Sequence, residues 1–272
     1  MTLLRKTMTG NGVFSVVTGA LSIALAEPLS EMMAVAEAVL YAVGVAVALY
    51  GALLLVTARR PVDHLFAFGV IAADLIWVVG AIVLLAIPGV MSVEGKVTLA
   101  IISVVVGVFA VSQAVGLIRA TIEWPFELRS EVEVEASPAE VWSTLADFST
   151  HGEWNPFIVA GHGDAIVGSE LSLDMKQPGG RQMRFRPIVT EASPPALLEW
   201  LGHFWRPGIF DGRHRFELTP TVSGTRLVQS ESFTGVLVPA MHGTLSRGTL
   251  DGFQSMNKAL KQRVESPVRH SD

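Results

Sequence analysis

Four long apolar stretches near the N-terminus constrain the fold of this chain more than any other feature. A helix that crosses the hydrocarbon core of a bilayer needs about 20 consecutive, mostly apolar residues, and the last three stretches meet that length easily. The stretches cover residues 8–26, 33–57, 64–87 and 97–121. The sequence therefore predicts an α-helical membrane bundle of four transmembrane helices in residues 1–121.

The first stretch has a second interpretation. Arg5 and Lys6 precede it, and Ala24-Leu25-Ala26 ends it, a pattern that also occurs in secretory signal peptides with an A-x-A cleavage site. We favour a retained helix because three further spans follow after a short loop, and the cleaved alternative stays open. The soluble half is predicted to be cytoplasmic in either case.

Lysine and arginine residues predict the orientation of the bundle. Both loops predicted to face outward are mainly acidic, with Lys96 as their one basic residue. We therefore expect a multi-pass protein of the inner or plasma membrane with both termini in the cytoplasm. The basic residues predicted to face the cytoplasm are Arg5, Lys6, Arg59, Arg60 and Arg119.

Small residues recur at four-residue spacing in the predicted spans, and such residues let helices approach closely. This spacing leaves open a homo-oligomer that associates through these helix faces. The positions are Ala34, Ala38, Ala42 and Ala46, with Gly44 and Ala48, then Gly69 and Ala73, and Ala110 and Ala114.

Asp74 is the one ionisable residue deep in a predicted span. An acid inside a membrane is costly and is by default a candidate functional group. A single acid is too little for a transporter or proton relay, so we favour a structural hydrogen bond to Gln113 or Ser103.

Residues 126–157 begin a second domain. Val132, Val134 and Ala136 alternate with glutamates, which predicts a half-exposed strand. Ser137-Pro138-Ala139-Glu140 then combines an N-cap serine, a proline in the first turn and a glutamate three residues after the serine, the pattern of a helix capping box.

Turn signals at 177–180, 193–195, 207–208 and 223–224 divide the following chain into about six antiparallel strands, including one over 181–191. An apolar stripe from Leu245 to Val264 then predicts a long helix. The predicted class is α+β: a bent antiparallel sheet crossed by a long C-terminal helix. We place a juxtamembrane joint and the start of the first strand at 122–130, the domain at 131–266 and a tail at 267–272.

The motifs ASPAEVW, LADF and WNPF at the start, and GRHRFELTP, TRLVQSESFTG and GFQSMNKALKQRVE at the end, resemble the SRPBCC superfamily over about residues 126–265. This is the START-like helix-grip fold of polyketide cyclases and lipid carriers. The resemblance implies a cavity between the sheet and the long helix. It does not fix the function, because fold does not imply function.

Strand alternation predicts which side chains line such a cavity. A hairpin turn near 222–224 would bring His214 across from Glu231, as on one face of an antiparallel pair. A buried imidazole beside a carboxylate can orient a ligand or act as a general acid–base pair. The predicted lining is Trp142, Trp154, Met183, Phe185, Trp200, His214, Phe216, Gln229, Glu231, Phe233, Phe253 and Met256.

Other chemistries are not indicated. The chain has no cysteine, and its seven histidines lack metal-ligand spacing, so neither a metal nor another cofactor is expected. Mixed charge along the strands gives no sign of a nucleic-acid partner.

We expect membrane-anchored binding or transport of a hydrophobic small molecule or lipid, with no catalytic residue. One alternative is a polyketide cyclase/dehydratase-like enzyme that uses His214 and Glu231. Another is a ligand sensor coupled to the membrane bundle.

Overall fold

The computed structural model describes residues 2–176 and 182–266 and divides the chain into two units, Met1–Ala120 and Thr121–Asp272. The hairpin turn predicted at 177–180 and the tail predicted at 267–272 lie outside the described residues.

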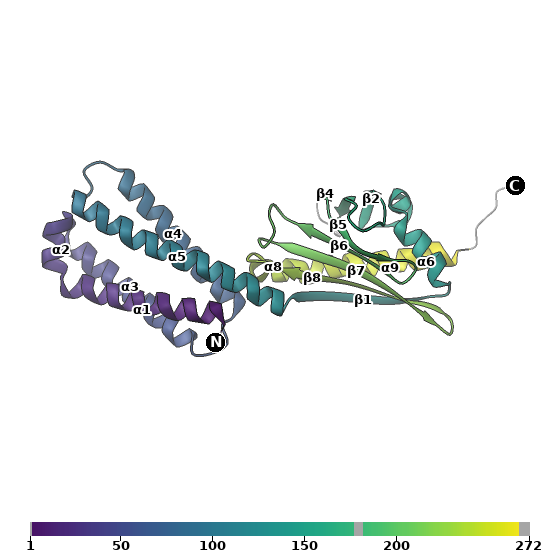
Figure 1. Ribbon diagram of the computed structural model, residues 1–272, viewed down its shortest axis with the longest axis horizontal. Coiled ribbons are helices and arrows are strands. Elements are labelled where there is room, and N and C mark those ends of the chain that lie inside the picture. The colour runs from purple at the N-terminus through teal and green to yellow at the C-terminus, as the bar shows by residue number, and fades with distance from the viewer. Residues whose placement is uncertain (1, 177–181, 267–272) are drawn as a thin grey trace. The chain divides into compact units, whose positions relative to one another are not determined.

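The first unit is helical (Figure 1). Helices α3, α4 and α5 are each long and apolar enough to cross a membrane, and α1 with α2 forms one more candidate span that is bent by 87°. The described part of this unit thus has three or up to four candidate spans. The bounds are α1 Leu3–Ala24, α2 Ala26–Met33, α3 Glu37–Thr57, α4 His64–Ala86 and α5 Val93–Glu123.

The short loop expected after the first apolar stretch is occupied by helix α2. Pro28 lies in the first turn of α2, where backbone N–H groups have no partner within the helix. Its missing N–H therefore costs nothing there, and the proline does not prevent helix formation.

Hydrogen bonds at each end of the bundle join the segments that the basic residues assign to the same side of the membrane. The Arg5 guanidinium donates to the carbonyl of Arg59 at 3.0 Å, which ties the N-terminus to the α3–α4 loop. At the other end, the Ser92 amide donates to the Met33 carbonyl at 2.9 Å. This contact ties the end of α2 to the α4–α5 loop.

Close packing between α1 and α3 depends on glycines of both helices. A Cβ atom at Gly19 would lie 2.7 Å from the Ala48 nitrogen, and one at Gly51 would lie 2.6 Å from the Gly12 carbonyl oxygen. The small residues Gly44 and Ala48 do lie at this contact, as their spacing predicts. The matching glycines of α1 were not anticipated. Gly69 has no described atom within 4 Å of its Cβ position, so this glycine marks no close helix contact among the described residues.

The described residues of the second unit form two antiparallel sheets, with orders β1-β8-β7-β6-β5 and β2-β3-β4. Its strands are β1 Phe126–Val134, β2 Ile158–His162, β3 Ser172–Lys176, β4 Gln182–Phe185, β5 Ile188–Ser193, β6 Leu197–His203, β7 Asp211–Thr221 and β8 Gly224–Thr234. Its helices are α6 Pro138–Ala146, a 3-10 turn Phe148–Thr150, α7 His151–Trp154, α8 Val238–Thr244, a π-helical turn Leu245–Thr249 and α9 Leu250–Glu265.

The single strand expected over 181–191 is wrong. It breaks into β4 and β5, which belong to different sheets. Pro187 lies between them and has no N–H to donate to a neighbouring strand. The Pro187 carbonyl instead accepts from the Leu171 amide at 2.8 Å, at the passage from one sheet to the other.

The capping box at α6 is confirmed. The Ser137 hydroxyl accepts from the Glu140 amide, and the Glu140 carboxylate accepts from the Ser137 amide at 2.8 Å. Val141 and Leu145 are buried on the inner face of the helix. The local sequence therefore fixes where α6 begins and which face it buries.

The long C-terminal helix is confirmed, with a π-helical turn between α8 and α9. Phe253, Met256 and Leu260 of α9 are fully buried in the core beneath the sheet. Gly252 permits a close approach, because a Cβ there would lie 2.6 Å from Cε2 of Phe157. The helix and the five-stranded sheet thus enclose the interior in which the candidate site lies.

Candidate functional site

The β7–β8 hairpin places His214 directly opposite Glu231, as predicted. Nδ1 of His214 lies 3.5 Å from a carboxylate oxygen of Glu231. The His214 side chain is 1% exposed, whereas the Glu231 side chain is 14% exposed. Solvent or a ligand can therefore contact this pair only on the side of Glu231.

Gln229 extends the pair into a three-residue polar group. Its amide nitrogen lies 3.0 Å from Nε2 of His214 and 3.5 Å from the sulfur of Met256 on α9. An amide nitrogen can only donate, so Nε2 accepts, and a neutral ring carries its proton on Nδ1. That proton faces the Glu231 carboxylate.

Aromatic side chains enclose the imidazole. The Trp200 ring of β6 stacks on His214 with centroids 4.8 Å apart and an interplanar angle of 13°. Phe216 lies at 4.7 Å, and Phe253 of α9 lies edge-on at 5.0 Å. The low polarity of this shell strengthens any hydrogen bond made inside it.

Two buried atoms of the polar group lack a hydrogen-bond partner among the described residues. They are Oε1 of Gln229 and Nδ1 of His214, whose contact with Glu231 is long. Buried polar atoms in native proteins are usually satisfied, so each exception calls for a functional or structural explanation. One donor and one acceptor are thus available within one apolar shell.

Gly212 makes room for the Glu231 carboxylate. A Cβ at this position would lie 2.6 Å from Oε1 of Glu231 and 3.6 Å from the Phe233 ring. The glycine shares a strand face with His214, two residues along β7. Sequence reasoning missed this position, and its only signal was a small residue at i−2 from His214 on the inward face.

The structure brings eight of the twelve predicted lining residues together around the polar group and places the other four elsewhere. Met183 is 51% exposed on β4 and Phe185 is half-buried on the same strand, both in the other sheet. Trp142 and Trp154 are half-buried at the edge of the core. The residues that meet are Trp200, His214, Phe216, Gln229, Glu231, Phe253 and Met256, with Phe233 beside Gly212.

Asn155 forms a turn. Its side-chain oxygen accepts from the amides of Phe157 and Ile158, both at 2.9 Å. His151, which sequence reasoning considered only as a metal ligand, is fully buried beside it, with Nε2 2.9 Å from the Leu145 carbonyl oxygen. Burial lowers the pKa of His151, against the opposing effects of that carbonyl and of Asp147.

Within residues 2–176 and 182–266, no group of three or more histidine, aspartate or glutamate side chains could hold a metal ion. The chemistry available at the site is hydrogen bonding and proton transfer by an imidazole and a carboxylate inside an aromatic shell.

This combination of an antiparallel sheet, a long C-terminal helix and an interior between them defines a helix-grip domain. The family described as polyketide cyclase / dehydrase and lipid transport matches residues 125–265, just over half of the chain. The chain belongs to this family, and the resemblance to polyketide cyclases is confirmed.

Several solved structures are similar in fold. A protein from Mesorhizobium loti is 19% identical with a TM-score of 0.40 and covers 50% of this chain and 95% of its own. A protein from Nitrosomonas europaea is 22% identical with a TM-score of 0.41 and the same two coverages. The di-domain ARO/CYC StfQ from the steffimycin biosynthetic pathway is 14% identical with a TM-score of 0.43, and covers 64% of this chain and 63% of its own. No protein with a curated description matches the chain.

Proposed function

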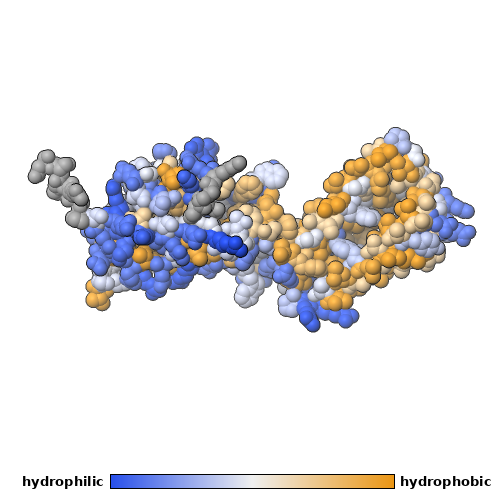
Figure 2. All heavy atoms as spheres, turned by 180° about the vertical axis from the view of Figure 1, so that it is seen from behind, coloured by the Kyte–Doolittle hydropathy of each residue, from blue (hydrophilic) through white to orange (hydrophobic). Residues whose placement is uncertain are grey.

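We propose that the protein is an integral membrane protein with four spans whose cytoplasmic helix-grip domain binds a hydrophobic small molecule or lipid. Figure 2 supports the membrane part, because apolar side chains gather over the helices of the first unit on the face shown. Large apolar residues of this unit, such as Ile76, Val104 and Ile101, are exposed. A membrane tether keeps the binding domain at a high local concentration near a ligand that partitions into lipid.

The observation that carries the binding proposal is the polar group His214–Gln229–Glu231 inside its aromatic shell. Ligand sites are mostly apolar with a few convergent polar groups that fix orientation. Oε1 of Gln229 and Nδ1 of His214 supply an acceptor and a donor without partners among the described residues. A ligand hydroxyl would satisfy both atoms, whereas a ligand carbonyl could accept only from Nδ1 of His214.

The ligand approaches this group from the side of Glu231. His214, Gln229 and Phe253 are buried, while Glu231 keeps partial exposure next to Gly212 and Phe233. The β6–β7 loop carries Phe204 and Trp205, and Trp205 is 82% exposed. We propose this loop as the gate through which an apolar ligand enters from the bilayer.

Native mass spectrometry of the full chain, released from lipid nanodiscs, tests the binding proposal. An apolar small molecule should be retained by the wild type and lost by about tenfold or more in H214A and E231A, since a hydrogen bond to a charged group contributes about 1.5–3 kcal/mol. The H162A variant, which removes an exposed histidine, is the matched control. Equal retention in all four proteins, or none in the wild type, would contradict the proposal.

A second candidate function rests on the 3.5 Å contact between His214 and Glu231. An imidazole and a carboxylate at this separation can act as general acid and base. In a dehydration, one would remove the proton beside a carbonyl and the other would protonate the leaving hydroxyl. The E231Q variant separates the candidates: retained ligand with lost turnover indicates an enzyme, whereas a carrier shows no turnover in either form.

A further inference from the structure

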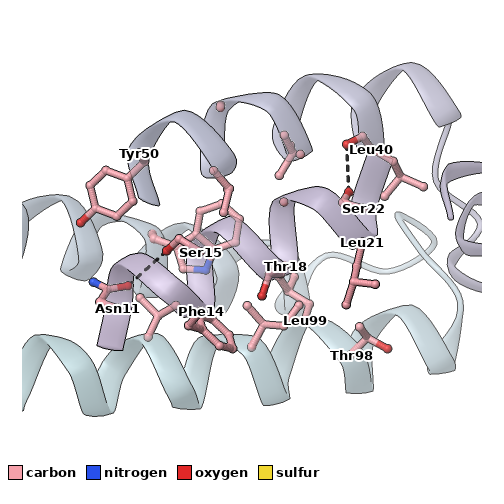
Figure 3. A pocket seen from close by; sticks show the side chains of 18 of the residues that line it. Asn11, Phe14, Ser15, Thr18, Leu21, Ser22, Leu40, Tyr50, Thr98 and Leu99 are labelled. Carbon is pink, nitrogen blue, oxygen red and sulfur yellow. Dashed lines mark hydrogen bonds between the residues drawn. The ribbon is translucent and has the colours of Figure 1, made fainter. Parts of the chain in front are cut away.

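The helical unit contains a cavity of about 590 Å³. This volume falls within the range of about 300–1,000 Å³ that small-molecule sites occupy. Residues of all five helices line it, and most of them are apolar. Figure 3 shows Phe14, Thr18 and Leu99 along its middle and Leu21, Leu40 and Thr98 toward one end.

The opposite end of the cavity is polar, and Asp74 is its centre. The Asp74 carboxylate accepts from Nδ2 of Asn11 at 2.8 Å and from the Tyr50 hydroxyl at 2.9 Å. Ser15 donates to Oδ1 of Asn11 at 3.2 Å, and Figure 3 shows Asn11, Ser15 and Tyr50 together at this end. All four residues line the cavity.

This arrangement corrects one of the two partners expected for Asp74, namely Ser103. Ser103 donates instead to the Leu99 carbonyl of its own helix at 2.7 Å. The observed donors come from α1 and α3, so the carboxylate links three helices. Asp74 is 3% exposed and lies deep inside the helix bundle.

The polar end has unused hydrogen-bonding capacity. A carboxylate offers about four acceptor positions, of which Asn11 and Tyr50 use two and the side chain of Gln113 can take a third. Nε1 of Trp77, which also lines the cavity, is buried and has no hydrogen-bond partner among the described residues. No lysine or arginine occurs among the described residues that line the cavity, so an anionic ligand would meet uncompensated negative charge or dipole at Asp74.

We propose that this cavity binds an amphiphile with one apolar body and a small head group that donates hydrogen bonds, with the head group at Asp74. A long-chain alcohol and a long-chain amine share this chemistry. The apolar walls bury the chain, and the carboxylate accepts from the head. This site is separate from the helix-grip interior and does not depend on what binds there.

Photolabelling of the full chain in lipid nanodiscs tests the site. A dodecanol that carries a diazirine should label peptides from α1, α3 and α4, and unlabelled dodecanol or dodecylamine should compete. Dodecane and dodecanoate should compete about tenfold less well, because neither donates a hydrogen bond to a carboxylate. Tighter competition by dodecylamine would identify a cationic head group as the preferred one. Equal competition would show that a neutral hydrogen-bond donor is sufficient.

Two variants locate the site by different means. D74N removes the carboxylate, and L99W fills the middle of the cavity while leaving the Asp74 group intact. Each should reduce labelling about tenfold, whereas S103A, which removes a buried hydroxyl outside the cavity lining, should not. Equal competition by dodecane, unchanged labelling in L99W, or capture of bilayer phospholipid only would overturn the proposal.

Discussion

The position of one proton determines how the His214–Gln229–Glu231 group can bind a ligand. Because the Gln229 amide donates to Nε2, the neutral imidazole presents Nδ1–H on the side of Glu231. The group then offers a donor from the ring beside an acceptor from the carboxylate. A hydroxyl can satisfy both, which favours a ligand with a hydroxyl at its polar end.

Gly212 gives a test of this geometry at the scale of one residue. In G212A the new Cβ would meet Oε1 of Glu231, the far end of a flexible side chain, so the carboxylate moves and the fold is hardly strained. We expect unfolding stability within about 0.5 kcal/mol of wild type and a several-fold loss of retained ligand by native mass spectrometry. The control is G202A on the paired strand position, where a Cβ would be 3.6 Å from its nearest neighbour, Pro187. Equal ligand retention in both variants would show that Glu231 is not a ligand contact.

Because His151 is buried, we expect the domain to lose stability in acid. Burial holds its pKa below the usual value of about 6.5, so in the folded state the ring stays neutral where the unfolded chain already binds a proton. Above that pH both states are neutral and the group makes no difference. As the pH falls below about 6.5 the unfolded state gains protons first, and the free energy of unfolding falls by up to about 1.4 kcal/mol per pH unit.

Urea unfolding of the full chain, followed by tryptophan fluorescence between neutral and mildly acid pH, measures this effect. Five of the six tryptophans lie in the second unit, so the signal reports mainly on that domain. The H151Q variant should lose the steep part of the pH dependence, and H162Q should retain it because His162 is exposed. A wild-type curve that is flat through this range would contradict the explanation.

At the scale of elements, α9 is held against the core by the absence of a side chain at Gly252. In G252A the added Cβ would press on Phe157, which is buried and lies edge-to-face with Phe253 at 5.7 Å. Overpacking of this kind costs about 1–3 kcal/mol, more than the helix propensity of alanine returns. The domain should therefore unfold at lower urea concentration.

Gly243, in the neighbouring helix α8, provides the matched control for G252A. Its Cβ position has no described atom within 4 Å, so G243A gains up to about 1 kcal/mol from helix propensity alone. The two glycine-to-alanine changes should thus shift the urea midpoint in opposite directions. A shift in the same direction would mean that Phe157 repacks without cost.

Patterns in the sequence predict the elements well where one physical rule dominates. Alternation along β7 and β8 places His214 opposite Glu231, and the capping residues define the start of α6. Two other features needed three-dimensional information. The chain breaks at Pro187, so that one predicted strand becomes two strands in different sheets. Asn11 and Tyr50 donate hydrogen bonds to Asp74 from helices that are distant in sequence. Neither result follows from local periodicity.

The surface charges of the sheet also combine a feature that the sequence predicts with one that only the structure reveals. Dispersed arginines and acids predict a solvated face, and the structure pairs them across strands, as in the contact of Arg215 with Glu199 at 3.0 Å. Burial raises the pKa of Glu199, but hydrogen bonds from Thr190, Arg213 and Arg215 lower it by more. The sequence indicated the composition of this face but not that Glu199 would be its buried centre.

At the scale of the whole molecule, the absence of cysteine makes sidedness directly measurable. Contacts inside the first unit group the N-terminus with the α3–α4 loop and the end of α2 with the α4–α5 loop. Since lysine and arginine concentrate in cytoplasmic loops, we expect the first group inside and the second outside. Four spans would then place the helix-grip domain in the cytoplasm.

Single-cysteine variants test this orientation. In intact cells, a membrane-impermeant maleimide should label E94C, at the exposed start of α5, and should leave V222C, at the fully exposed β7–β8 turn, unlabelled. V222C should react only after the membrane is permeabilised, and the cysteine-free parent should not react at all. The reverse pattern in intact cells, with V222C labelled and E94C protected, would mean that α1 and α2 do not form a span, because three spans from a cytoplasmic N-terminus place the α4–α5 loop inside and the chain after α5 outside. The domain would then lie outside the cell, where its ligand would have to come from the outer leaflet.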